Sequence, residues 1–130
     1  MNHKKLVIIP TFNELENIRE MIETVMELEG DFSLLIIDDG SPDGTAAEVK
    51  SLKSIFPERL HLLERKGKLG LGTAYITGFK WALERSYDFI FEMDCDFSHD
   101  PKDLIRLYEA VKGRNYDLAI GSRYITGVNV

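Results

Sequence analysis

The sequence predicts an α/β fold: an open, mostly parallel, doubly wound sheet of about five strands with helices on both faces. Short apolar runs alternate with segments of helical periodicity in the order β-α-β-α-β-α-β-α-β. The apolar runs are continuous, which is typical of strands buried on both faces. The connections are short, and polar residues gather directly after the apolar runs.

The first half of the chain supplies three of the expected strands and two of the expected helices. The strands are expected over Leu6–Ile9, Leu34–Ile37 and Leu60–Leu63. The first helix follows the first strand and places these apolar residues on one face: Ile18, Met21, Ile22, Val25 and Met26. The second helix follows the second strand and buries Ala46, Val49, Leu52 and Phe56. Pro57 is expected to stop it, because the residue before a proline disfavours the helical conformation.

The second half continues the alternation. Two more strands are expected, over Phe89–Met93 and Leu118–Ile120. The helix before them is expected to bury Ala74, Gly78, Trp81 and Ala82. The helix between them is expected to bury Leu104, Leu107, Tyr108 and Val111. Asp100 is expected to cap this last helix, because Asp is favoured at the N-cap and Pro101 suits the first helical position.

The composition fits one compact domain and argues against several classes of protein. The chain has 130 residues, of which 44% are hydrophobic, and this is enough for one core. Its net charge of -6 argues against nucleic-acid binding, which needs clustered Lys and Arg. Cys95 is the only cysteine, so we expect no intrachain disulfide and a reducing cytosol. We expect no signal peptide, because Lys4 and Lys5 are followed by only five apolar residues including Pro10. We expect no membrane span, because every apolar run is far shorter than the roughly 20 residues that a span requires.

A polar segment follows each expected strand. These segments are Pro10–Glu14, Asp38–Thr45, Arg65–Gly72, Asp94–Asp100 and Gly121–Arg123. In open α/β sheets, ligands bind beyond the carboxyl ends of the strands. We therefore expect the five segments to converge on one site.

Two carboxylates, Asp94 and Asp96, stand one residue apart after the fourth strand. Hard divalent cations prefer oxygen ligands, and a cation removes the repulsion between two close carboxylates. We therefore expect Mg²⁺ or Mn²⁺ here, with Ser98 or Asp100 as a further ligand, although a capping role is favoured for Asp100. A calcium loop of the EF-hand type is excluded, because His and Ile occupy the positions of its required Gly and Glu.

The segment Asp38–Thr45 combines a turn with a candidate ligand. Its two glycines and its proline favour a turn, and Ser41 or Asp43 is expected to cap the following helix. Asp39 could accept hydrogen bonds from a ribose or a base. Asp38 is expected to be structural.

The segment Arg65–Gly72 is basic and rich in glycine and opens a helix, whose N-terminal N–H groups attract anions. It lacks the Gly-Lys-Ser/Thr of a Walker loop, and Tyr75 stands where a dinucleotide fingerprint needs Gly or Ala. By itself, the segment is also typical of a flexible turn. Arg123, after the fifth strand, is a candidate phosphate clamp.

Four segments in this order resemble family 2 glycosyltransferases of the GT-A fold: Val7–Glu14, Asp38–Thr45, Asp94–Pro101 and Gly121–Tyr124. Within the family, the chain is most similar to the polyprenol-monophosphate mannosyltransferases, often called dolichol-phosphate mannose synthases. The resemblance implies that residues 1–130 form a nucleotide-sugar-binding GT-A domain, which is a Rossmann-like sheet. Family members continue past the fourth segment, so we expect this domain to be the N-terminal part of a longer catalytic domain.

The resemblance also implies roles for individual residues. The implied donor-binding residues are Pro10, Phe12, Glu14, Asp39, Lys66, Gly70 and Asp94. The implied metal ligands are Asp94, Asp96 and Ser98. The residues implied to act in catalysis, by stabilising charge on the leaving diphosphate, are Asp94, Asp96 and Arg123.

The implied reaction transfers mannose from GDP-mannose to a polyprenyl phosphate, with inversion and with Mg²⁺ or Mn²⁺ as cofactor. Because the second pKa of the acceptor phosphate is about 6, no protein base is needed, and no obvious base is present in the sequence. The resemblance further implies a cytoplasmic protein, peripheral at the cytoplasmic face of the membrane, that contacts the membrane through a part beyond residue 130. A homodimer is also expected, because an incomplete sheet would expose apolar surface.

Three other functions remain open. One is a family 2 transferase that uses UDP-glucose or another donor. Another is a binding module that holds a nucleotide sugar without turnover. The third is a nicotinamide-dependent enzyme of similar topology, which Tyr75 and the acidic pair after the fourth strand disfavour.

Overall fold

The structure, a computed structural model, describes residues 3–67, 69–112 and 118–120. Its strands are β1 (Lys5–Thr11), β2 (Ser33–Asp38), β3 (Leu60–Glu64), β4 (Phe89–Glu92) and β5 (Leu118–Ile120). Its helices are α1 (Leu15–Glu27), α2 (Thr45–Lys53), α3 (Leu71–Glu84) and α4 (Asp103–Val111). The sheet order is β3-β2-β1-β4-β5, and every neighbouring pair is parallel. The predicted doubly wound α/β fold is therefore confirmed.

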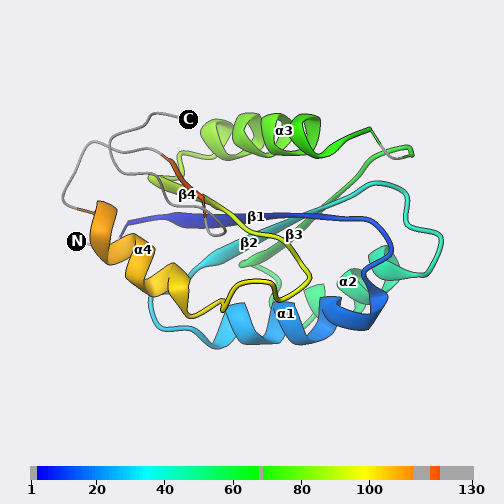
Figure 1. Cartoon of the computed structure of the whole chain (residues 1–130), viewed down its shortest axis with the longest axis horizontal. Coiled ribbons are helices and arrows are strands. Elements are labelled where there is room, and N and C mark those ends of the chain that lie inside the picture. The colour runs from blue at the N-terminus through cyan, green and yellow to red at the C-terminus, as the bar shows by residue number, and fades with distance from the viewer. Residues whose placement is uncertain (1–2, 68, 113–117, 121–130) are drawn as a thin grey trace.

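The helices form layers on both faces of the sheet (Figure 1). Helices α1, α2 and α4 pack on one face, and α3 packs on the other. This arrangement follows from the handedness of crossover connections. The chain adds β2 and then β3 in one direction from β1. It then reverses direction, passing β2 and β1 to reach β4. Because the direction of the crossover is reversed, α3 covers the opposite face. In the ranges that the structure describes, no helix is both long and apolar enough to cross a bilayer.

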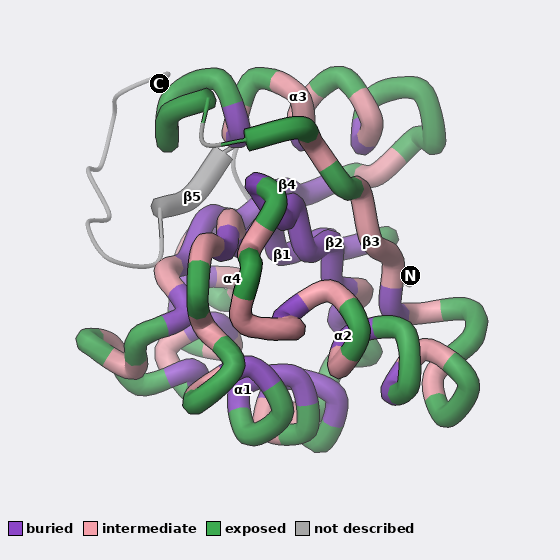
Figure 2. The backbone as a smooth tube through the Cα atoms, turned by 90° about the vertical axis from the view of Figure 1, so that its right-hand side faces the viewer, coloured by how far each residue is buried: buried purple, intermediate pink, exposed green. Residues whose placement is uncertain are grey.

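The central strands are buried on both faces, which explains their continuous apolar sequence. In β1, Val7 and Ile9 pack with the α1 layer, whereas Leu6 and Ile8 pack with α3. All four side chains are 0% exposed. Figure 2 shows these strands as the buried centre of the molecule. The strand sequences do not alternate between apolar and polar residues because both faces of the sheet are packed against helices.

Two predicted helix boundaries are wrong by a few residues. Helix α2 ends at Lys53 and does not reach Phe56, because turns occupy the residues before and after Pro57. Helix α4 begins at Asp103, so Asp100 is not its N-cap. Asp100 instead accepts a hydrogen bond from the backbone N–H of Lys102 at 3.0 Å in the preceding turn. Asp100 therefore has a structural role, as predicted, but in the turn before α4 and not at the N-cap of the helix.

Helix α3 lies unusually close to the sheet at Gly78. A Cβ atom at this position would lie 2.7 Å from Cδ1 of Ile8 and 3.1 Å from Cδ1 of Ile37. The absence of a side chain at Gly78 therefore sets the distance of α3 from β1 and β2. Ala74 and Ala82 are buried as predicted, whereas Trp81 is only half-buried and lies at a tilted angle beside His61.

We predict that Gly78→Ala lowers the free energy of unfolding by about 1–3 kcal/mol relative to Gly72→Ala. Overpacking at the sheet costs about 1–3 kcal/mol, while both variants gain about 1 kcal/mol of helix propensity. Gly72 is the matched control because a Cβ there meets nothing within 4 Å. Urea denaturation measures both variants, and equal stabilities would show that α3 does not depend on this close contact.

Candidate donor-binding site

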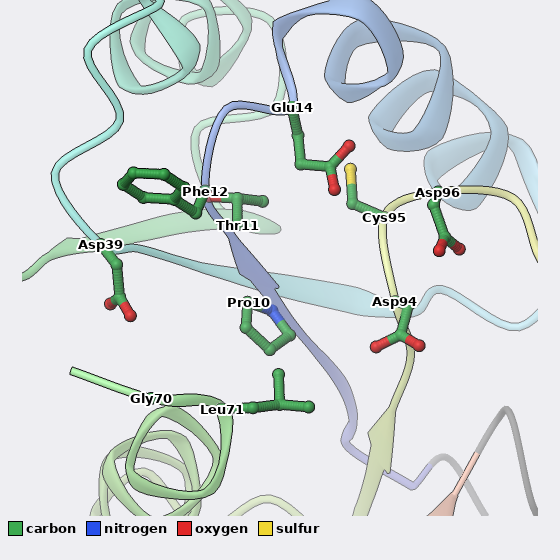
Figure 3. A pocket seen from close by; sticks show the side chains of 10 residues that line it. All are labelled: Pro10, Thr11, Phe12, Glu14, Asp39, Gly70, Leu71, Asp94, Cys95 and Asp96. Carbon is green, nitrogen blue, oxygen red and sulfur yellow. The ribbon is translucent and has the colours of Figure 1, made fainter. Parts of the chain in front are cut away.

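The carboxyl ends of β1 and β4 form the topological switch point of the sheet. The chain leaves β1 toward β2 on one side, and β4 pairs with β1 on the other side. Ligands of doubly wound proteins bind at such points. A pocket of about 250 Å³ opens there (Figure 3). It is lined by Pro10, Thr11, Phe12, Glu14, Asp39, Gly70, Leu71, Asp94, Cys95 and Asp96.

The pocket brings together most of the residues predicted from sequence. Seven of them line it: Pro10, Phe12, Glu14, Asp39, Gly70, Asp94 and Asp96. Lys66 is exposed on the segment that precedes Gly70, and Ser98 contacts Asp96, but neither residue lines the pocket. Arg123 lies outside the described residues. Figure 3 shows Asp39 on one side of the end of β1 and the Asp94–Asp96 pair on the other, as the sheet order requires.

Asp39 forms a buried, two-pronged ion pair with Arg65. Nε of Arg65 donates to Oδ1 of Asp39 at 2.7 Å, and Nη2 donates to Oδ2 at 2.9 Å. The Arg65 and Asp39 side chains are only 11% and 8% exposed. The backbone N–H of Leu69 adds a third donor to Oδ2 at 3.3 Å. Both carboxylate oxygens therefore have fixed directions, and a ligand would meet a rigid acceptor.

Arg65 is a site residue that the sequence prediction missed. The register of β2 with β3 pairs Asp38 with Glu64, so the next residues on the two strands, Asp39 and Arg65, also lie side by side. A carboxylate and a cation placed directly after adjacent parallel strands are the signal that could have found this pair.

Arg65 also fixes the glycine-rich segment that forms one wall of the pocket. Its Nη1 donates to Oγ1 of Thr73 at 3.0 Å, and its Nη2 donates to the carbonyl of Gly70 at 3.2 Å. The turn after β2 lies against the same segment, since a Cβ at Gly40 would sit 3.0 Å from the backbone N of Gly67. Gly40 also has φ +71°, which favours glycine. The segment is thus held by specific contacts and is more than a flexible turn.

Asp38 is structural, as predicted. It is 1% exposed, and its Oδ1 accepts hydrogen bonds from the hydroxyls of Thr11 and Ser41, both at 2.7 Å. The predicted cap of α2 by Ser41 or Asp43 is wrong, because the N-cap is Gly44, without a side-chain cap hydrogen bond. Asp43 instead accepts the backbone N–H of Thr45 at 3.0 Å in the turn before the helix. These bonds fix the turn from which Asp39 projects into the pocket.

The opposite side of the pocket concentrates negative charge around Cys95. Burial and the nearby carboxylates of Glu14, Asp96 and Asp94 raise the pKa of the Cys95 thiol to about 12. The thiol is therefore protonated at neutral pH and is a poor nucleophile, as the sequence predicted. Glu14 was expected to line the base pocket, but in Figure 3 it lies beside Cys95, on the side of the acidic pair.

A fourth acidic residue, Glu92, lies at the end of β4 and is 8% exposed. Burial and the charge of Asp94 raise the pKa of Glu92 to about 7. Burial and Asp94 also raise the pKa of Tyr75, whose hydroxyl makes a long contact of 3.5 Å with Oδ1 of Asp94. Hydrogen bonds from the side chain and backbone of Ser98 lower the pKa of Asp96 and keep it ionised.

The charges and donor atoms of this acidic side fit a hard divalent cation. Among the described residues, none of Glu14, Glu92, Asp94 or Asp96 forms an ion pair with a Lys or Arg. The described ranges also contain no group of three acidic, His or Cys side chains arranged to hold a metal. A cation on Asp94 and Asp96 would thus take its other ligands from water and a bound phosphate, as Mg²⁺ usually does. The geometry favours a metal that the nucleotide helps to bind.

Comparison with known proteins identifies the family. The family model described as glycosyl transferase family 2 matches residues 6–130. The chain belongs to this family. Its curated relatives include a polyprenol monophosphomannose synthase of Mycolicibacterium smegmatis, 47% identical over 98% of this chain and 48% of the relative. They also include an undecaprenyl-phosphate mannosyltransferase of Micrococcus luteus, 46% identical over 94% of this chain and 49% of the relative. The chain spans about half the length of these relatives.

Solved structures of glycosyltransferases confirm the GT-A fold of this family 2 chain. A mannosyltransferase from Pyrobaculum calidifontis, in complex with GDP-Man and Mn²⁺, aligns with a TM-score of 0.70 and 24% identity. The alignment covers 81% of this chain and 31% of that one. S. aureus TarS 1-349 in complex with UDP aligns with a TM-score of 0.71 and 22% identity over 98% of this chain and 38% of that one. At these identities, the likeness concerns the fold.

We predict that Arg65→Ala lowers the free energy of unfolding by about 3 kcal/mol, because it leaves the buried Asp39 carboxylate without its partner. The matched control is Lys50→Ala, which removes the exposed ion pair with Glu64 at 3.0 Å and should cost about 0.5 kcal/mol or less. Urea denaturation compares the two variants. An Arg65 effect as small as the control would contradict a buried pair that fixes the pocket.

We also predict a pH-dependent stability from Glu92 in buffer that contains a chelator. Its folded pKa of about 7 lies above the unfolded value of about 4.3. The stabilising contribution of its proton is therefore complete below about pH 4 and is lost as the pH rises through about 7. Glu92→Gln should gain about 2 kcal/mol of stability relative to the unsubstituted chain between roughly pH 5 and 8.

Thermal or urea unfolding across this pH range tests the Glu92 prediction. The control is Glu27→Gln, which removes one carboxylate from the exposed side of α1. A parallel pH profile for Glu92→Gln and the unsubstituted chain would contradict a buried, strongly perturbed carboxyl at the end of β4.

Proposed function

We propose that the chain is the nucleotide-sugar-binding GT-A domain, residues 1–130, of a mannosyltransferase that transfers mannose from GDP-mannose to a polyprenyl phosphate. The observation that carries the proposal is the pocket at the switch point. It has a rigid carboxylate acceptor, Asp39, at one end and the acidic pair Asp94 and Asp96 at the other. A nucleoside and a metal-bound diphosphate need these two chemistries in one site.

The comparisons support the choice of donor and acceptor. The curated relatives are named for the transfer of mannose to polyprenol-type or undecaprenyl phosphates. The Pyrobaculum neighbour, which is similar in fold, was solved with GDP-Man and Mn²⁺. We therefore propose GDP-mannose as the donor, a polyprenyl phosphate as the acceptor and Mn²⁺ or Mg²⁺ as the cofactor. By the same argument, we propose that the protein works at the cytoplasmic face of a membrane.

Each end of the pocket would hold one part of the donor. The nucleoside would lie near Phe12 and Asp39, where the remaining lone pair on Oδ1 of the fixed carboxylate can accept an N–H or O–H group. The diphosphate would lie toward Asp94 and Asp96, which would hold the metal, with Ser98 orienting Asp96. When bound, the metal would neutralise charge that develops on the leaving diphosphate. Arg123 remains a predicted contact of the donor phosphates, and Lys66 remains a predicted contact of the donor.

The proposed reaction is a direct displacement at the anomeric carbon of mannose. An oxygen of the acceptor phosphate forms the new bond as the bond to the GDP oxygen breaks, so the configuration inverts. The acceptor is ionised at neutral pH and needs no proton acceptor from the protein. The Cys95 thiol on the pocket wall, with its pKa raised to about 12, stays protonated near neutral pH and has no role as a nucleophile in this step.

The size of the pocket indicates how much of the donor it holds. Sites that enclose a whole ligand commonly measure about 300–1,000 Å³, whereas this pocket measures about 250 Å³. We propose that it holds part of the nucleotide sugar and that the remainder extends toward the acceptor. Transfer would then depend on the longer protein, whereas donor binding can be tested in this chain.

We predict that the chain binds GDP-mannose in a metal-dependent manner. Isothermal titration calorimetry with and without Mn²⁺ measures the binding, with UDP-glucose as the competing donor. Asp96→Asn should reduce the affinity for the Mn²⁺-bound donor by about tenfold to a hundredfold, because the loss of one ligand weakens metal binding and charge neutralisation.

Asp100→Asn is the matched control for this titration. It removes the same charge from the same loop, but Asp100 does not line the pocket and its bond to Lys102 can persist. We expect this variant to bind like the unsubstituted chain. Tighter binding of UDP-glucose than of GDP-mannose would be compatible with family 2 but would contradict GDP-mannose as the donor. Binding that is independent of metal, or equal losses in both variants, would contradict the role of the acidic pair.

A further inference from the structure

Exposed apolar side chains gather on α3 and on the segment before it. Six large apolar side chains are exposed in the described ranges, and four belong to this region: Leu69 (57%), Leu71 (58%), Ile76 (55%) and Leu83 (69%). We call these four residues the α3 surface. Ile76 and Leu83 are seven residues apart, which places them on the same side of the helix. Figure 2 shows the outer side of α3 as exposed.

The outer side of α3 differs from that of α1, which covers the opposite face of the sheet. Helix α1 carries five charged residues among 13, and these form its solvated face. Helix α3 carries only two among 14, Lys80 and Glu84. A solvated helix normally has a charged outer face. The outer face of α3 instead exposes Ile76 and Leu83 with few charges between them, which indicates that this side contacts something other than water.

The charge of this region is opposite to that of the rest of the chain. Three of the described cations in this region, Lys66, Lys80 and Arg85, are exposed beside one exposed carboxylate, Glu84, whereas the whole chain carries a net charge of -6. A basic, apolar surface on an acidic protein is complementary to an anionic lipid surface, because cations attract the headgroups and apolar side chains enter the acyl boundary.

The α3 surface begins at the mouth of the donor-binding pocket. Leu71 and Gly70 line the pocket, and Leu71 is at the same time 58% exposed. The exposed Lys66 lies on the same segment. A molecule that covers the α3 surface would therefore also border the opening beside Asp94 and Asp96.

We propose that the α3 surface lies on an anionic lipid bilayer and turns the mouth of the pocket toward it. This inference rests on the proposed function, because a polyprenyl phosphate presents its phosphate at a membrane surface. It places a membrane contact within residues 69–83, in addition to the contact expected from a part beyond residue 130.

Sedimentation with vesicles tests the proposal. Vesicles of phosphatidylcholine with phosphatidylglycerol are compared with vesicles of phosphatidylcholine alone. The chain should partition at least tenfold more strongly onto the anionic vesicles, and added salt should weaken this binding. The double variant Ile76→Ser/Leu83→Ser should partition about tenfold more weakly, and Ile76→Glu/Leu83→Glu should be weaker still.

The matched control is Leu15→Glu/Ile55→Glu, which introduces the same charges at exposed apolar positions, 43% and 60% exposed, away from α3. Its partitioning should stay within about twofold of the unsubstituted chain. Circular dichroism confirms that all variants are folded. Equal binding to both kinds of vesicle, equal losses in control and α3 variants, or a dimer that only the α3 variants disrupt would each overturn the proposal.

GDP-mannose titration of the same samples separates this proposal from the proposed function. Vesicle binding that depends on α3 without donor binding would retain the membrane surface and reject the mannosyltransferase assignment. Donor binding without vesicle binding would support the proposed function and reject the membrane surface on α3.

Discussion

The parallel pairing of β1 with β2 on one side and β4 on the other is the constraint on which the rest of the structure depends. It buries β1 on both faces and brings the carboxyl ends of three strands to one edge of the sheet. Asp39 after β2 and Asp94 after β4 are 55 residues apart in sequence, and both line one pocket with the end of β1 between them. The site is therefore a consequence of the topology, and its chemistry comes from the residues that follow each strand.

The two ends of the pocket satisfy their charges differently. At Asp39, the protein supplies its own cation, because Arg65 binds both carboxylate oxygens and at the same time holds the glycine-rich wall. At the end of β4, Glu14, Glu92, Asp94 and Asp96 gather without an ion pair to a Lys or Arg among the described residues. Burial, together with this unbalanced charge, raises the pKa values of Glu92 and Cys95. One end is thus preorganised by the chain, and the other is suited to a cation that arrives with its ligand.

Most of the fold follows from local sequence signals. Continuous apolar runs such as Leu6–Ile9 and Leu34–Ile37 identify strands buried on both faces, and the rule for parallel sheets then indicates which polar residues converge. The errors have local causes as well. The early end of α2 and the late start of α4 depend on turns whose hydrogen bonds, such as that of Asp100 with Lys102, do not appear as periodicity. The Arg65 contact depends on the register between β2 and β3, which no single segment encodes.

The central claim is that one ligand bridges Asp39 and the acidic pair through a metal at Asp94 and Asp96. Paramagnetic broadening of backbone amide signals by Mn²⁺, with and without GDP, tests it most directly. The account predicts that GDP strongly increases the broadening at residues 93–98 and Glu14, and that the Asp39 and Phe12 signals shift as the nucleoside binds. Broadening that is unchanged by GDP, or that is centred away from the end of β4, would contradict the account.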